Sequence, residues 1–156
     1  MAADPVLYKD AYMALGTSTS SYVNFSASLK SLQFPLSKAE LANSVMGDDA
    51  ETFEQGLESL KITATFRQDF TTAATGIDKA MYTGWKNGTK YYALFKPVNT
   101  TTATTNPEYR CRVKIFTHNP MSGAHGELLQ SDVTLNLLSA TSTSTAYNGI
   151  TRATSS

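Results

Sequence analysis

The amino-acid sequence predicts a mainly β domain with one flanking α-helix and long loop and terminal arms, on three observations. The stretch Leu57–Phe70 alternates apolar and polar side chains with a period of two, which is typical of a strand with one buried and one solvated face. A segment at about 75–87 repeats apolar residues with the period of a helix. The connection 36–56 and the two ends, 1–20 and 139–156, show weak patterns, and we expect arms there.

The alternating stretch predicts the central strand of the domain. Its buried face would carry Leu60, Ile62, Ala64 and Phe66, and its wet face Lys61, Thr63, Thr65 and Arg67. Such a strand needs partners for its backbone groups. Upstream, Tyr12–Leu15 can form a short strand within the N-terminal arm, and Val23–Phe34 alternates as another. The phase of the second slips at Lys30–Ser31, where either a β-bulge or a simple bend fits.

The connection 36–56 is acidic and has no clear periodicity. All charges from Glu40 to Glu58 are negative, with no cation between Lys38 and Lys61. One interpretation is a solvated loop. The other is a loop that packs against a partner, another copy of the protein being one candidate, because it also carries apolar side chains at Leu41, Val45, Met46, Phe53 and Leu57.

The helix is predicted from one apolar stripe and from the residues at its two ends. Asp78 three residues after Thr75 approximates a capping box, and Asn87–Gly88 is a typical left-handed stop after Lys86. We expect the stripe to pack against a sheet with all its members buried, which are Ile77, Ala80, Met81, Gly84 and Trp85.

The C-terminal half predicts three more strands. Lys90–Lys96 is apolar on both faces, as expected of a strand covered on both sides. Tyr109–Ile115 alternates, with Arg110, Arg112 and Lys114 on its wet face. A turn region at 118–126 then leads to a return strand at Val133–Leu137, which predicts a hairpin. The tail 139–156 is small and polar, and we expect it to become ordered only against a neighbour.

Composition limits the possible functions. The chain has 156 residues, the size of one domain, with 13 basic and 13 acidic residues. Zero net charge gives no global attraction to nucleic acid or anionic lipid. The single Cys111 cannot form an intramolecular disulfide, which suits folding in a reducing cytosol. We see no signal peptide and no apolar run of membrane-spanning length, so no membrane partner is expected.

The sequence offers no catalytic or metal-binding constellation. His118 and His125 share one predicted turn, and with Asp132 they have no recognised metal-ligand spacing. Cys111 is predicted to point into the core, where a thiol is unreactive. We therefore expect no enzyme, no metal site and no cofactor.

The charges are segregated along the chain. An acidic block at 40–58 is followed by a block at 79–114 that contains seven cations and one acid, Glu108. The two blocks can neutralise each other within one fold or between copies, and head-to-tail contacts between copies generate rings or filaments. Nucleic-acid binding is the rival interpretation, because Arg110, Arg112 and Lys114 would stand about 7 Å apart on one strand face. Zero net charge weighs against it.

The chain resembles the major tail proteins that build the tail tube of long-tailed bacteriophages. The resemblance runs from about Ser28 onward, in the family's order and with similar spacing. The segments that carry it are Met46–Asp48, Gly56–Ser59, Phe66–Phe70, Asn106–Tyr109, Asn119–Gly123 with Gly126, and Thr151–Thr154.

This resemblance implies a single tail-tube-like domain over 1–156, folded as an antiparallel β-sandwich or barrel with a flanking helix. It implies hexameric rings stacked into a tube that conducts the viral genome at ejection, located in the virion tail after assembly in the host cytoplasm. Other tail proteins, such as the tape measure and the terminator, would be partners, and viral DNA would pass through the lumen without specific binding. No cofactor is implied.

By the same resemblance, the loop 36–56 would reach a neighbouring ring, the arms 1–20 and 139–156 would join subunits, and paired strands would line the lumen. Tubes of this family tend to have acidic lumens, so we expect the strand cations of this chain at subunit contacts or outside. The candidate assembly residues are Asp48, Asp49, Glu51, Glu54, Lys61, Arg67, Arg110, Arg112, Lys114 and Arg152.

Two other classes of function stay open. A capsid decoration protein or glycan-binding β-sandwich module would use Trp85 and tyrosines as stacking platforms, and so would need an exposed aromatic surface. An enzyme would need a motif that the sequence lacks.

Overall fold

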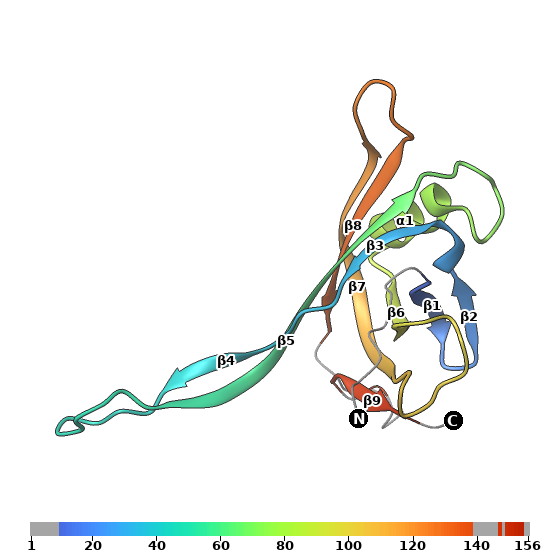
Figure 1. Ribbon diagram of the computed structural model, residues 1–156. Coiled ribbons are helices and arrows are strands. Elements are labelled where there is room, and N and C mark those ends of the chain that lie inside the picture. Colours follow the sequence, from blue (N-terminus) through green and yellow to red (C-terminus); the bar gives the residue numbers. More distant parts are fainter. Residues whose placement is uncertain (1–9, 139–146, 148, 155–156) are drawn as a thin grey trace.

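The computed structural model describes residues 10–138, 147 and 149–154. They form a curled antiparallel sheet with one α-helix, from which a long two-stranded arm projects (Figure 1). The mainly β fold with a single helix is therefore confirmed. The elements are β1 Tyr12–Ser18, β2 Ser21–Asn24, the 3-10 helix η1 Ser26–Ser28, β3 Leu29–Gln33, β4 Leu36–Ala42, β5 Phe53–Arg67, α1 Ile77–Asn87, β6 Lys90–Lys96, β7 Glu108–Ser122, β8 Gln130–Leu137 and β9 Thr151–Ala153.

The strands follow the order β2-β1-β6-β7-β8-β5-β3, with β4 added to β5 and β9 added to β7. One face of this sheet forms the core, which includes Met13, Ile62, Phe66, Val113 and Leu135. The helix α1 covers this core face, because Ile77 and Met81 belong to the same buried cluster. No helix in the described part of the chain is long and apolar enough to cross a membrane.

The central strand is confirmed and is longer than its alternating pattern. β5 has 15 residues, and its second half pairs with β3 on one side and β8 on the other. Its first half pairs with β4, from Leu36 opposite Leu60 to Ala42 opposite Phe53. The segment 36–56, expected to be an irregular loop, is therefore mostly a β-hairpin. The alternation of apolar and polar residues is missing there because both faces of the hairpin are exposed.

The short strand predicted at Tyr12–Leu15 is present as β1, but it belongs to the sheet of the domain and not to an arm. β1 lies between β2 and β6, and Met13 and Leu15 are buried. The expected arm over 1–20 therefore excludes Tyr12–Ser18, and residues 1–9 lie outside the described residues. The predicted strand 23–34 is divided by η1 into β2 and β3. The register of β3 shifts between Leu29 and Ser31, in agreement with the bulge interpretation.

The helix begins and ends close to its predicted limits, with two corrections. Gly76 is the N-cap and no side chain caps this end, so Thr75 forms no capping box. Gly88 ends the helix in the left-handed conformation with φ 61°, as predicted. Trp85, expected to be buried, is 45% exposed, and its ring lies 6.1 Å from that of exposed Tyr82.

The position of Gly84 explains the exposure of Trp85. A Cβ atom at Gly84 would clash with the Tyr91 hydroxyl and would lie 2.9 Å from Ile115 Cδ1. The helix therefore approaches the sheet most closely at Gly84, and Trp85 falls on the flank of the contact.

The predicted hairpin β7–β8 is confirmed, but β7 runs on to Ser122. The turn expected at 118–126 therefore starts only after residue 122. Pro120 is accommodated because the register shifts between Asn119 and Ser122, which leaves the proline outside the regular ladder. The expected C-terminal arm is ordered in part on its own chain: Tyr147 is buried and β9 pairs with β7. Residues 139–146, 148, 155 and 156 lie outside the described residues.

We predict that Met81→Ala lowers the free energy of unfolding by about 2–5 kcal/mol, because it opens a cavity in the core beneath α1. Trp85→Ala should cost less, about 1–2 kcal/mol, because about half of this side chain is already in water. Urea unfolding of the two variants checks the difference. Equal losses would show that the helix is turned about its axis relative to this arrangement.

We predict that Cys111 does not react with a thiol reagent at pH 8 in the folded protein and reacts fully in denaturant. Burial raises the pKa of this thiol from 9.0 to about 12, so the reactive thiolate is scarce. The folded state favours the neutral thiol. The stability that the neutral thiol contributes to the folded state is therefore complete below pH 9 and is lost as the pH rises from 9 to about 12. Labelling of folded protein at the rate of a free thiol would contradict this placement.

Candidate assembly interface

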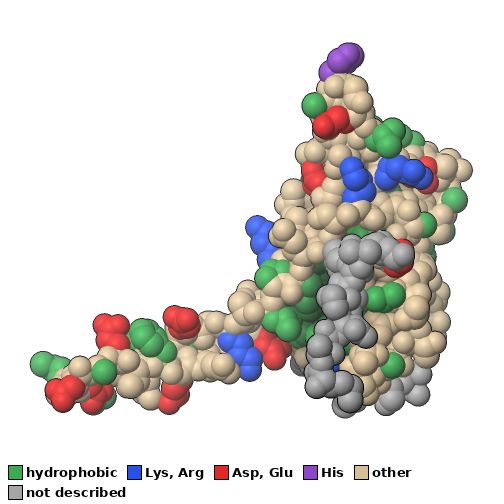
Figure 2. All heavy atoms as spheres, viewed as in Figure 1, with side chains coloured by type: hydrophobic (Ala, Val, Ile, Leu, Met, Phe, Trp, Pro, Cys, Tyr) green, Lys and Arg blue, Asp and Glu red, His purple; other side chains and the backbone are tan. Residues whose placement is uncertain are grey.

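The arm, defined here as residues 36–59, is the most exposed part of the described chain. Every residue of β4 is exposed, and the apolar side chains of both strands point into solvent. Figure 2 shows hydrophobic and acidic side chains along its whole length. Met46 is fully exposed and Leu57 is 86% exposed. The other large exposed apolar side chains of the arm are Leu36, Leu41, Val45 and Phe53. An apolar surface of this kind indicates an interaction site.

The tip of the arm is held by short-range hydrogen bonds. The Asp48 carboxylate accepts a bond of 2.8 Å from the Val45 N–H, and Glu54 accepts one of 2.7 Å from the Asn43 amide. Gly47 has φ 108°, a conformation that favours glycine. Four of the predicted interface residues therefore lie together on the distal half of an ordered β-hairpin. These are Asp48, Asp49, Glu51 and Glu54.

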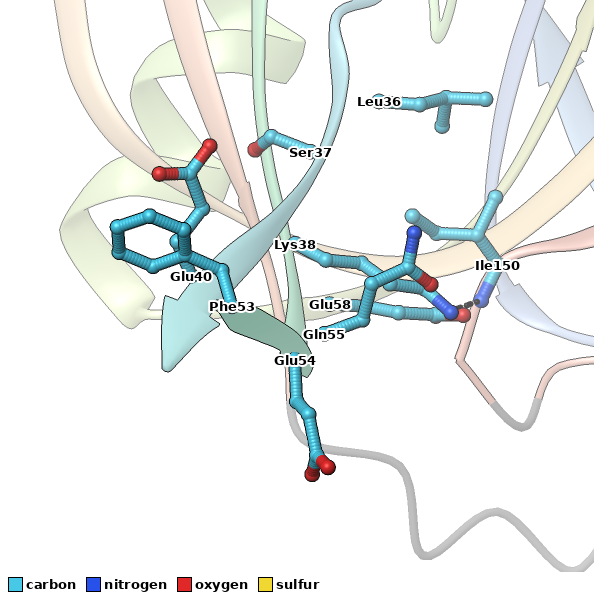
Figure 3. A pocket seen from close by; sticks show the side chains of 9 residues that line it. All are labelled: Leu36, Ser37, Lys38, Glu40, Phe53, Glu54, Gln55, Glu58 and Ile150. Atoms are coloured by element: carbon cyan, nitrogen blue, oxygen red, sulfur yellow. Dashed lines mark hydrogen bonds between the residues drawn. The ribbon is translucent and has the colours of Figure 1, made fainter. Parts of the chain in front are cut away.

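A pocket of about 560 Å³ lies where the arm leaves the body (Figure 3). Leu36, Phe53 and Glu58 of the arm line it together with Ile150 of the C-terminal segment. The Ile150 N–H donates a hydrogen bond of 3.2 Å to Glu58 Oε2. The root of the arm and the C-terminal segment are therefore joined within one subunit.

Tyr147 anchors the C-terminal segment to the sheet. Its hydroxyl is hydrogen-bonded to that of Tyr22, and its ring meets the Tyr92 ring edge-on at 4.9 Å. Burial is the main cause that raises the pKa of Tyr147 above its ordinary value, and the hydrogen bond to Tyr22 is the second cause. Residues 147 and 149–154 thus pack on their own chain, whereas the sequence predicted order only against a neighbour.

The structure brings two of the predicted cations into one row across the sheet. Lys61 on β5 stands opposite Asn136 on β8, Asn136 opposite Lys114 on β7, and Lys114 opposite Lys90 on β6. Lys61 and Lys90 are exposed and Lys114 is half-buried. Lys114 Nζ would lie 3.1 Å from a Cβ at Gly88, so its ammonium stands near the C-terminus of α1. We call Lys61, Lys90 and Lys114 the lysine row.

The remaining predicted cations lie apart from this row. Arg110 pairs with Glu108 on its own strand, and the Arg112 guanidinium lies 5.1 Å from the centre of the Tyr92 ring. Arg67 is opposite Gln130, at the other end of the paired half of β5, and Arg152 is on β9. Sequence reasoning did not select Lys90, because only the register between strands places it beside Lys114.

The side chains considered for metal binding do not converge. The His118 ring is buried, with Nε2 3.8 Å from Asp78 Oδ1 and Nδ1 3.4 Å from Ser131 Oγ. Burial lowers its pKa, although Asp78 raises it in part. His125 lies in the turn between β7 and β8, and the Asp132 carboxylate accepts a bond from Thr65. Among the described residues, no three His, Cys, Asp or Glu side chains form a metal-binding group.

Comparisons with known proteins give matches in structure alone. No family model and no curated protein matches the sequence. The SPP1 tail tube matches with a TM-score of 0.67 at 12% identity, over 96% of this chain and 80% of that one. The tail of an empty gene transfer agent particle with C6 symmetry matches with 0.64 at 13% identity, over 84% and 92%. The tube-terminating cap of the anti-feeding prophage matches with 0.55 at 14% identity, over 99% and 95%.

These similarities cover most of each chain and agree with the resemblance found in the sequence. At such low identity they establish the fold alone. The chain therefore has the fold of tail-tube proteins.

Proposed function

We propose that this protein is a structural subunit of a virion tail, and that copies of it assemble into stacked rings that form the tail tube. The observation that carries the proposal is the arm, whose large apolar side chains are each more than half exposed among the described residues. Burying one such side chain contributes roughly 1.5–3 kcal/mol, so the arm offers a large gain on association. The tail-tube fold of the chain supports a second copy as the partner.

The finer parts of the proposal rest on the resemblance and on the structural neighbours. C6 symmetry in the gene transfer agent tail supports hexameric rings. The stacked rings would form the conduit for genome ejection, with the tape measure and terminator proteins as partners, and assembly would take place in the host cytoplasm. The single domain 1–156 would contribute the arm and both terminal segments to contacts between subunits.

Part of the sheet face opposite the core suits a lumen that conducts DNA. Between Lys61 and Arg67, the outward positions of β5 are Thr63 and Thr65, and the facing positions of β8 are Thr134 and Asp132. The side chains of Thr65 and Asp132 are hydrogen-bonded to each other at 2.8 Å. A face of hydroxyl groups with few cations would hold phosphates only weakly, which is what passage of DNA requires.

A glycan-binding or capsid decoration module is the second candidate function. One observation favours it, namely the exposed pair of Tyr82 and Trp85 on α1. Stabilisation of the protein by oligosaccharides, measured as a rise in melting temperature, would support this candidate. The tail-tube proposal expects no such rise.

Negative-stain electron microscopy over a range of protein concentrations tests the proposed function. Rings or hollow tubes are the expected result. Particles that stay monomeric at every concentration, by microscopy and by sedimentation, would contradict self-assembly of the purified chain.

We predict that the double variant Met46→Ser, Phe53→Ser folds normally and fails to assemble. Both side chains are exposed, so the free energy of unfolding should change by less than about 0.5 kcal/mol. Loss of two buried apolar groups at the interface should raise the concentration needed for assembly more than about a hundredfold. Sedimentation checks assembly and urea unfolding checks stability.

Tyr82→Ser is the control, because it removes an exposed aromatic ring from α1 and leaves the arm intact. Tubes formed by the arm variant at the wild-type concentration would show that the apolar side chains of the arm are not at the interface.

A further inference from the structure

The acidic tip of the arm and the lysine row are two surfaces of opposite charge. The tip carries Asp48, Asp49, Glu51 and Glu54, and the row carries Lys61, Lys90 and Lys114. Within the described residues, none of these seven side chains takes part in an ion pair. Among the described residues, the charge of each surface is therefore uncompensated.

The two surfaces of one subunit cannot meet. Glu54 and Lys61 lie on the same strand, seven residues apart, which separates them by roughly 23 Å. The remaining acids of the tip are farther along the hairpin, which points away from the body (Figure 1). Pairing with β4 keeps this part of β5 extended, so the tip cannot fold back on the row.

We propose that the acidic tip of the arm of one copy docks on the lysine row of another copy. This inference rests on the proposed function and names the surface that receives the arm. The contact joins unlike surfaces, so each copy has one donor and one acceptor surface and the association can propagate. The row lies at the end of the paired half of β5 from which the arm leaves, beyond the neutral positions Thr63 and Thr65.

Charge and apolar burial have different roles in this contact. An exposed ion pair contributes about 0.2–1 kcal/mol, so the carboxylates and ammonium groups select the docking position more than they supply affinity. The affinity comes from the apolar side chains of the arm, among them Val45, Met46 and Phe53, which can pack on the aliphatic stems of the lysines. The acids of a neighbouring tip would also compensate the charge of Lys61 and Lys90, which no acid on their own sheet pairs with among the described residues.

Charge reversal with rescue tests the docking surface. We predict that Asp48→Lys with Asp49→Lys, and separately Lys61→Glu with Lys90→Glu, raises the concentration needed for assembly about tenfold or more. The variant that combines all four changes should return towards the wild-type concentration, because the charges are opposite again. Lys79→Glu on α1 is the matched control for loss of an exposed cation elsewhere. Thermal unfolding confirms that each variant is folded.

Carbodiimide cross-linking of assembled wild-type protein is the second measurement. The reagent joins carboxylates to amines in direct contact, and mass spectrometry should find Asp48, Asp49 or Glu51 linked to Lys61, Lys90 or Lys114. Links from the arm acids to other lysines alone would overturn the proposal. So would full assembly of both reversed pairs, or failure of the combined variant to recover.

These outcomes are separate from failure of the proposed function. A wild-type chain that forms no polymer contradicts the tail-tube role. Wild-type tubes together with normal assembly of the Lys61→Glu, Lys90→Glu variant contradict only the docking surface. If that variant assembles but loses retention of added DNA, the row binds nucleic acid and the proposal is overturned.

Discussion

The continuity of β5 is the constraint on which the rest of this structure depends. One strand of 15 residues is a core strand in its second half and an exposed strand of the arm in its first half. In the core half, β3 and β8 saturate its backbone groups, and Ile62, Ala64 and Phe66 fix its position by burial. In the arm half, β4 alone pairs with it. The arm therefore has a defined direction without a core of its own.

Local patterns in the sequence predicted the elements whose signal depends on burial. The second half of β5, the helix α1 and the hairpin β7–β8 each have one buried face, which imposes a period of two or 3.6 on the residues. The arm has no buried face, so its strands leave no such pattern. The prediction that Trp85 is buried was wrong because the helix approaches the sheet most closely at Gly84. That position depends on the sheet residues Tyr91 and Ile115.

The candidate site was predicted as two blocks of charge, and its geometry needed the fold. The acids stay together in the arm because they are neighbours in sequence. The cations separate, because strand register carries Lys61 and Lys114 into one row with Lys90 but leaves Arg67 at the other end of the paired half of β5. Register is set by long-range pairing of strands, which a single sequence does not reveal. Arg110 is not available to pair with the acidic block for another reason, because it already pairs with Glu108.

The continuity of β5 also has a mechanical consequence. A pull on the tip of the arm acts along the strand axis, and so loads the hydrogen bonds of β5 with β3 and β8 in shear. Bonds loaded in this direction must break together, whereas bonds at the end of a peeled hairpin break one after another. The hydrogen bond between Glu58 and the Ile150 N–H ties the base of this lever to the C-terminal segment as well. Tension between neighbouring subunits would thus be carried into the most deeply buried part of the domain.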